Sequence, residues 1–478
     1  MRPGKLFRVR LVAAAFGLWL MGPNPLIAVE AGEGMPDVLQ GIEILDIGTA
    51  KQIAIEGSPT LAAAYERVYQ AEERVRQARA AYWPSIDAGG SGARVELSNN
   101  EVKSQLSSAR RFDPSNRIDD STDIYRSELT GGWALFTGFR RRFENARARF
   151  GELESRSALE EARRLLIFSV ATSYYEAQLA RENIAIAKAD EAFNLRQASE
   201  AKSRRRAGSG SLSDVLNFEI QVNAARSDLN DAERGYELAR IALAAVMGLP
   251  DAYLPEPIDI AELPDETSVE MAEPEPVNLI AFADYHRPDL MSSILRIRQA
   301  ETEIGIAKSE YYPTLTLEGA IDGEREDNLE FERDDYGNTI GLFLNINLFS
   351  GGATRARVAE ARFLSREAER NFEAVRISVS SDIREAVATV RSSQRELILQ
   401  RENAKLVQKN RELVEKGYAA GQESLVRLNE AQRDLIQAQG RLALSLVALK
   451  QQWERLDAAT GGNLLLFAPP SEKVEIRP

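Results

Sequence analysis

Two segments of the chain alternate between apolar and polar side chains at the period of a β-strand. Glu128 and Asn345 are among the polar residues, and each segment has one apolar face. The apolar residues are Leu129, Trp133 and Leu135 in the first segment and Leu342, Ile346 and Leu348 in the second. Alternation over about ten residues suits a membrane-spanning strand, although a half-buried soluble sheet would show it too. We predict that these six residues face lipid.

Each alternating segment is the second strand of a predicted strand pair, so the chain is expected to supply four strands. Four strands cannot close a barrel by themselves, and an open sheet leaves unpaired edges. A membrane location therefore requires several copies of the chain.

A long helical pattern follows each strand pair. From about Arg140 to Arg206 there is no proline, and apolar residues recur at spacings of three, four and their sums. They are Leu166, Val170, Tyr174, Ala177, Ile184 and Phe193, with counterparts 213 residues later at Val379, Ile383, Val387, Val390, Leu397 and Leu406. This spacing predicts helices packed side by side, and at 1.5 Å per residue the helix would be about 100 Å long.

Shorter helices complete each half of the chain. A return helix is expected over Leu212–Met247 and again from Leu425 to about residue 459, and a helix before the strands over 58–82 and 288–312. Ser58 and Pro59 suit the cap and first position of the earliest of these. Two short helices placed end to end would match one long one in length.

The two halves are copies of each other. The segment 81–84, Ala-Tyr-Trp-Pro, corresponds to 310–313, Glu-Tyr-Tyr-Pro, at an offset of 229. From Leu135-Phe136-Thr137-Gly138 onwards the offset is 213, and it stays 213 at the glycine-serine turns more than 70 residues later. The difference of 16 places a longer loop in the first copy, around Asn99–Ser121.

The organisation of the chain follows from these patterns. Residues 1–31 have the cationic start, apolar run and small-residue exit of a signal peptide. We expect a first repeat over 45–249, an acidic, proline-rich connector over 250–277, a second repeat over 278–462 and a tail over 463–478.

Composition removes several functional classes. There is no cysteine and one histidine, His286, so cysteine chemistry is absent and histidine-cluster metal sites and most histidine-based catalysis are disfavoured. We therefore expect no catalytic residue, no cofactor and no metal. The net charge is −13 and would become −16 after loss of residues 1–31, which disfavours a nucleic-acid partner.

The ordered set of elements, present twice, resembles the TolC-like outer-membrane efflux protein family, the outer membrane factors. The features that carry the resemblance are the Tyr-Trp-Pro and Tyr-Tyr-Pro strand starts, the Leu-Phe-x-Gly strand ends, the Gly-x-x-Ser turns and the segment 286–290, His-Arg-Pro-Asp-Leu. Together they cover about residues 45–465, which is nearly the whole mature chain.

This resemblance implies a homotrimer that is mainly α with membrane β. Four strands per protomer would make a 12-stranded β-barrel, continuous with a long α-helical periplasmic barrel. The protein would lie in the outer membrane of a Gram-negative bacterium, contact its lipid and extend into the periplasm. It would be a passive exit duct rather than an enzyme, working with a periplasmic adaptor and an inner-membrane transporter in efflux or type I secretion.

The helix turns resemble the tunnel tips that contact the adaptor. They comprise Gly208, Ser211 and Leu212 in the first copy and Gly421, Ser424 and Leu425 in the second. Glycine permits the turn and serine can cap the helix that follows, so these residues could equally be turn chemistry alone.

The resemblance also implies an acidic pore constriction just beyond the second tip, where the family pattern is Asp-Val-Leu-Asp. Glu430 matches the second acidic position, whereas Arg427 replaces the first; the first copy retains Asp214. A ring of Glu430 carboxylates would favour cations, and Arg427 could neutralise it. An ordinary solvated helix position for Glu430 remains open.

Other features carry weaker signals. The basic run 202–206 is interpreted as a solvated helix end that complements the helix dipole, and the acidic segment 322–335 as an extracellular loop without the spacing of a calcium site. The alternative functions are a periplasmic adaptor and a structural coiled-coil protein of the cell envelope. An adaptor has one helical hairpin, and a coiled coil does not explain the four strands.

Overall fold

A computed structural model describes residues 39, 41–109 and 121–467. The predicted signal peptide, part of the first extracellular loop and most of the predicted tail lie outside these residues. The first repeat runs through β1 (Ile44–Leu45), α1 (Ile47–Gly57), α2 (Pro59–Ala80), β2 (Ser85–Glu96), α3 (Asn99–Ala109), β3 (Ser121–Thr137), α4 (Arg140–Arg206) and α5 (Leu212–Met247).

The connector and the second repeat follow in the same order. The connector holds η2 (Pro250–Ala252) and β4 (Asp259–Ile260). The repeat comprises α6 (Pro276–His286), α7 (Pro288–Ser309), β5 (Thr314–Glu326), η3 (Arg333–Asp335), β6 (Tyr336–Asn345), α8 (Ala353–Ala419), α9 (Leu425–Thr460) and η4 (Gly462–Phe467).

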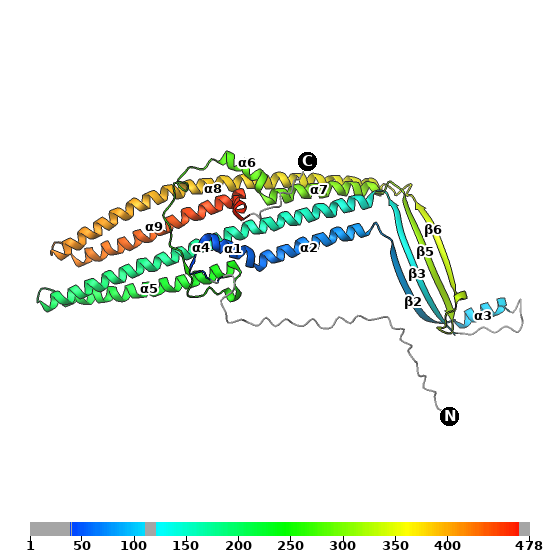
Figure 1. Cartoon of the computed structure of the whole chain (residues 1–478), viewed down its shortest axis with the longest axis horizontal. Coiled ribbons are helices and arrows are strands. Elements are labelled where there is room, and N and C mark those ends of the chain that lie inside the picture. Colours follow the sequence, from blue (N-terminus) through cyan, green and yellow to red (C-terminus); the bar gives the residue numbers. More distant parts are fainter. Residues whose placement is uncertain (1–38, 40, 110–120, 468–478) are drawn as a thin grey trace, which may run out of the picture. The chain divides into compact units, whose positions relative to one another are not determined.

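The duplication holds at the level of single helices. The helices α4 and α8 both have 67 residues, α5 and α9 both have 36, and α2 and α7 both have 22. Their boundaries differ by the predicted offsets of 213 and 229. Strands lie at one end of the long helices and the helix turns at the other (Figure 1).

Three short helices were missed from the sequence, and one of them, α3, lies in the segment expected to be the longer first loop. Helix α1 precedes the helix expected at Ser58, and α6 is its repeat equivalent. Pro59 and Pro288 occupy the first turn of α2 and α7, so each proline separates the short helix from the next one. Ser58 is the cap residue of α2, but its side chain makes no capping hydrogen bond.

The four long strands form one antiparallel sheet in the order β2-β3-β5-β6. Leu129 pairs with Ile321, Trp133 with Leu317, and Leu317 with Leu342, so these apolar residues share one face. Leu129, Trp133 and Leu342 are exposed, at 46%, 40% and 61%. The sheet therefore presents an apolar surface that nothing in this chain covers among its described residues.

Three of the six residues proposed to face lipid differ from expectation in their backbone. The register shifts between Ala134 and Phe136, so Phe136 rather than Leu135 pairs with Leu315 on the apolar face. Hydrogen bonding of β6 ends at Asn345, so Ile346 and Leu348 follow the strand rather than belong to it. A period-2 pattern could not reveal the bulge, because an inserted residue reverses the alternation after it.

The helices pack along their lengths as α4 with α5, α8 with α9, and α4 with α7. Val170, Tyr174, Ala177 and Phe193 are buried as the helical spacing predicted, and most of their counterparts in α8 are buried too. Leu406 is the exception, with 62% exposure, although its repeat equivalent Phe193 is 3% exposed. Among the described residues, no helix combines the length and apolar character needed to cross a membrane.

Candidate functional site

The first hairpin tip is a short turn between α4 and α5. Gly208 has φ +79°, a backbone conformation that side chains disfavour. The Ser211 hydroxyl accepts a hydrogen bond from the Asp214 backbone N–H at 3.0 Å and thereby caps α5. Leu212 is 48% exposed at the start of that helix. The three residues predicted from the sequence thus build the turn and one exposed apolar position.

The second tip repeats this construction between α8 and α9. Gly421 has φ +75°, and the Ser424 hydroxyl accepts a hydrogen bond from the Arg427 backbone N–H at 3.2 Å. Leu425 is half-buried rather than exposed, because it packs against the apolar cluster described next. The backbone chemistry of the two tips is the same, but their surroundings are not.

The two hairpins of one chain are joined near their tips by an apolar cluster, which we call the tip core. Its buried members are Phe193, Ala198, Ala201, Val215, Phe218, Val222, Val414, Leu428 and Ala431. Tyr418 packs against this core, with its ring edge-on to Phe218 at 6.2 Å and the Arg204 guanidinium 5.2 Å from its centre. Burial raises the pKa of Tyr418, and the negative charge of Asp214 raises it further.

Polar contacts line the same seam between the hairpins. The Asn429 amide donates to Asn217 Oδ1 at 2.8 Å, the Gln432 amide to Asp190 Oδ1 at 2.7 Å, and the Gln197 amide to Glu415 Oε1 at 3.3 Å. Burial raises the pKa of Asp190, and the hydrogen bond from Gln432 opposes that effect. These contacts were not predicted, since only folding brings residues more than 200 positions apart together.

The three pore-constriction candidates lie at the tips but in different roles. The Arg427 guanidinium is 3.7 Å from the Glu430 carboxylate, and the two side chains are 54% and 53% exposed. Asp214 lies in the first turn of the other hairpin's return helix and its backbone is capped by Ser211. An exposed pair at this distance holds its partners weakly.

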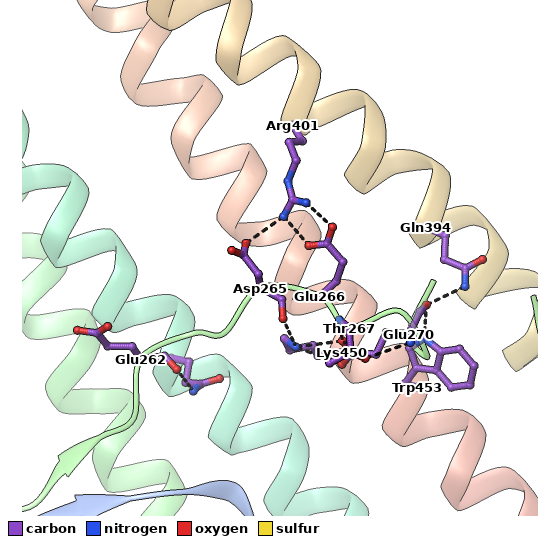
Figure 2. Close-up of polar contacts among 10 residues, drawn as sticks. Glu262, Asp265, Glu266, Thr267, Glu270, Gln394, Arg401, Lys450 and Trp453 are labelled. Carbon is purple, nitrogen blue, oxygen red and sulfur yellow. Dashed lines mark hydrogen bonds and ion pairs between the residues drawn. The ribbon is translucent and has the colours of Figure 1, made fainter. Parts of the chain in front are cut away.

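The acidic connector was predicted from the sequence, but its contacts were not. It crosses from the first hairpin to the second and contacts α8 and α9 through side chains that include Gln394, Arg401, Lys450 and Trp453 (Figure 2). Arg401 pairs with Asp265 at 3.0 Å and also with Glu266, while Lys450 pairs with Glu270 at 3.1 Å. The Gln394 amide and the Trp453 indole both donate to the Glu270 carbonyl oxygen at 2.8 Å.

The connector is bound on its other side by the first hairpin. The Gln178 amide donates to the carbonyl oxygen of Ala261 at 2.8 Å, and the Arg240 guanidinium to that of Pro255 at 2.8 Å. Arg240 is the repeat equivalent of Trp453, so equivalent positions of both return helices hold the connector. The sequence does show that these equivalent positions carry different residue types. That difference could not be interpreted without the path of the connector.

The other residues singled out from the sequence make contacts within the fold that account for them. His286 stacks on Phe282 at 3.9 Å and its Nδ1 lies 2.8 Å from the Phe282 carbonyl oxygen, at the end of α6. The acidic segment 322–335 is only partly a loop, because 322–326 belong to β5 and 333–335 to η3; Arg325 of β5 pairs with Asp335 of η3 at 2.6 Å. Among the described residues, no group of three or more histidine, cysteine, aspartate or glutamate side chains is placed to hold a metal ion.

Known proteins share both the sequence pattern and this fold. The sequence description of the family "Outer membrane efflux protein" matches residues 51–249 and 279–462. The pyoverdine export outer membrane protein OpmQ of Pseudomonas putida is 28% identical over 430 residues, covering 87% of this chain and 86% of that protein. The outer membrane protein TolC of Vibrio cholerae is 26% identical over 297 residues, covering 60% and 67%.

Solved structures agree on the fold. The outer membrane protein VceC of Vibrio cholerae superimposes with a TM-score of 0.67 at 20% identity, over 87% of this chain and 96% of that one. The two matched segments of the family coincide with the two structural repeats, which favours the duct over the adaptor and coiled-coil alternatives. The chain belongs to the outer membrane efflux protein family, and it is an outer-membrane exit duct of the kind used by efflux pumps and secretion systems.

Proposed function

We propose that three copies of this chain close head to tail into one duct that conducts substrate passively, with no catalytic activity of its own. The observation that carries this proposal is a set of charged side chains on α2 and α8 that form no ion pair with any described residue. Their positions match, through the repeat, those of a seam that the chain makes between its own helices. The sheet supports the same arrangement, because β2 and β6 are its two open edges.

The internal seam lies between α4 and α7. Glu154 accepts a hydrogen bond from Arg296 at 2.6 Å and from the Gln299 amide at 2.8 Å. By the offsets of 213 and 229, the equivalents of these three residues are Glu367, Arg67 and Gln70. All three residue types are retained. The helices α2, α4, α7 and α8 pack side by side in this order, so the equivalents lie on the two outer helices, α8 and α2.

A second ion pair in the internal seam supports the same mapping. Arg147 pairs with Glu303, and their equivalents are Glu360 and Arg74, so both signs are exchanged and the pair would still attract. Within the described part of the chain, Arg67, Arg74, Glu360 and Glu367 are exposed and form no ion pair.

Side-chain size is also complementary. In the internal seam the Phe143 ring occupies the space where a Cβ on Gly305 would lie, at 2.4 Å. The equivalents are Ala356 and Arg76, so the large and small partners are exchanged. We infer that α8 of one copy packs against α2 of the next, and that this repeating contact closes into a ring.

Charge exchange tests this assembly. Glu367→Arg should reduce the yield of the trimer that resists SDS, as should Arg67→Glu, and the double variant should restore it because the attraction returns with opposite signs. The matched control exchanges Arg370 and Glu373, an exposed pair on the same helix, and should leave the trimer unchanged. Trimers from both single variants at full yield, or a monomeric wild-type protein outside the outer membrane, would contradict the proposal.

At the other end of the helices, we propose that both hairpin tips contact a periplasmic adaptor, which links the duct to an inner-membrane transporter. The exposed Leu212 and the serine-capped turns support this role. Alanine at Leu212 should weaken cross-linking of the duct to its adaptor in cells, whereas alanine at the repeat-equivalent but half-buried Leu425 should act mainly through the tip core. Equal adaptor cross-linking in the Leu212→Ala variant and the wild type would remove this residue from the contact.

Glu430 is proposed to narrow the pore near the second tip, with Arg427 reducing its effect. Glu430→Ala should raise single-channel conductance and lower cation selectivity in planar bilayers, because three carboxylates are removed. Arg427→Gln should instead raise cation selectivity. If both variants conduct as the wild type does, neither residue lies at the constriction.

A further inference from the structure

Two grooves in the structure occupy the same place in the two repeats, at the junction of sheet and helices. The first, about 590 Å³, lies between α2 and α4 and is lined by Arg79, Arg142 and Arg149. The second, about 480 Å³, lies between α7 and α8. Its cations are Lys308, Arg355 and Arg362, which are the repeat equivalents of the first three.

The charge of the two grooves is not balanced locally. Among the described residues that line them, none is an aspartate or glutamate. Within the part of the chain that the structure describes, the six cationic side chains are exposed and form no ion pair. Other arginines on these helices do have acidic partners, for example Arg156 with Glu72 at 2.8 Å and Arg357 with Glu310.

Both grooves lie next to the apolar face of the sheet. The Trp133 indole, on that face, donates to the carbonyl oxygen of Tyr82, which lines the first groove. On the other side, Phe136 contacts Phe139 at 5.2 Å, and Phe139 contacts Tyr312, a lining residue of the second groove, at 5.5 Å. The apolar face and its aromatic border thus end where the cations begin, which is the arrangement of a membrane–water boundary.

We propose that these two grooves bind the phosphate groups of anionic phospholipids in the periplasm-facing leaflet. Guanidinium groups match phosphate oxygens in geometry and charge, and basic pockets beside membrane-embedded elements recognise lipid headgroups. Acyl chains would then lie along the apolar face while tyrosines border the headgroup. The inference rests on the proposed function, since it takes the apolar face of the sheet to contact lipid.

A trimer would carry six such grooves in one ring, at the level where the sheet gives way to the helices. Bound headgroups would neutralise cations that otherwise repel one another. The bound lipids would therefore help to set the depth of the duct in the membrane, and the hairpin tips would take no part in this.

The test counts lipids retained by the purified, full-length trimer in native mass spectrometry after exposure to phosphatidylglycerol or to phosphatidylcholine. The wild type should retain phosphatidylglycerol in preference. The variant Arg142→Gln, Arg149→Gln, Arg355→Gln, Arg362→Gln should bind it about tenfold more weakly or worse. The matched control removes four exposed cations from the helical hairpins, Lys188, Arg196, Lys409 and Arg433, again by glutamine, and should bind as the wild type does.

The outcomes separate the possible ligands. Equal retention of the two lipids by the wild type, or undiminished phosphatidylglycerol binding by the groove variant, overturns the proposal. Displacement of the lipid by millimolar inorganic phosphate would assign the grooves to a soluble anion, such as an anionic cargo, and also overturns it. Because the same spectra report trimer mass, a groove variant that stays trimeric but loses lipid tests this inference alone, whereas a monomeric wild type would count against the proposed assembly.

Discussion

The two helical hairpins have helices of equal length, and both bind the connector, but they bind it through different side chains. Lys450 and Trp453 of α9 bind the connector through Glu270, whereas the first-hairpin equivalent of Lys450 is the exposed Glu237. At the tip, Tyr418 is half-buried against the tip core, and its equivalent Arg205 is exposed. The two repeats therefore share their backbone geometry. Their side chains differ, and this difference determines which helix surfaces are buried within the chain and which are exposed to another molecule.

Removing a large side chain from the tip core should have the largest effect on stability. Phe218 is fully buried, so Phe218→Ala should lower the free energy of unfolding by about 3–5 kcal/mol through lost burial and a residual cavity. Chemical denaturation of the full-length protein, followed by circular dichroism, measures the change. Its repeat equivalent is already Ala431, and a conservative Ala431→Gly change should cost only about 1 kcal/mol. Similar losses from the two variants would mean that the core does not distinguish the hairpins.

The connector offers the next largest effect. Lys450 is only 4% exposed, and Lys450→Ala leaves the Glu270 carboxylate without its cationic partner, which should cost about 3 kcal/mol. Glu237→Ala, at the equivalent exposed position of the first hairpin, should change stability by less than about 0.5 kcal/mol. The same denaturation experiment compares them, and a Lys450→Ala protein as stable as the wild type would show that the connector does not hold α9.

Acid should loosen the connector from the second hairpin. Burial alone would raise the pKa of Glu266, but the hydrogen bonds and charge of Arg401 outweigh it and hold that pKa below the ordinary 4.5. The stabilisation from a lowered carboxyl pKa is complete above about 4.5 and is lost as the pH falls through the lower, folded value. The wild type should therefore lose its stability advantage over Glu266→Gln between pH 7 and pH 3, and a constant difference across that range would exclude this carboxylate as the source.

The smallest effect is expected at the exposed tip pair. Arg427→Gln removes one partner of a half-exposed pair at 3.7 Å, so stability should change by less than about 1 kcal/mol. Thermal unfolding should not separate this variant from the wild type, even though the cation selectivity of the channel should differ. A large loss of stability would instead place Arg427 in a buried contact between copies.

Much of the molecule was predictable because its periodicities are long and local. Proline positions, the heptad-like spacing of residues such as Tyr174 and Ile383, and the fixed offset between the repeats specify helix lengths and hairpin order without knowledge of any contact. The tips could be predicted for the same reason, since Gly208 and Ser211 act within a few residues of themselves. The six apolar strand residues were found by alternation, but the bulge beside Leu135 and the end of β6 before Ile346 depend on hydrogen bonds to neighbouring strands.

The sequence alone determined what each half of the protein is: a strand pair, two long antiparallel helices and a capped turn, repeated at a constant distance. How the halves meet depends on tertiary contacts, because Asn217 with Asn429 and Arg401 with Glu266 join residues far apart in the chain, and no local pattern encodes such a pairing. The tertiary structure also decided which charges are left over. In the sequence, Arg67 and Glu367 look like any other charged residues. They indicate a contact between copies only because their repeat equivalents, Arg296 and Glu154, form an ion pair in the fold.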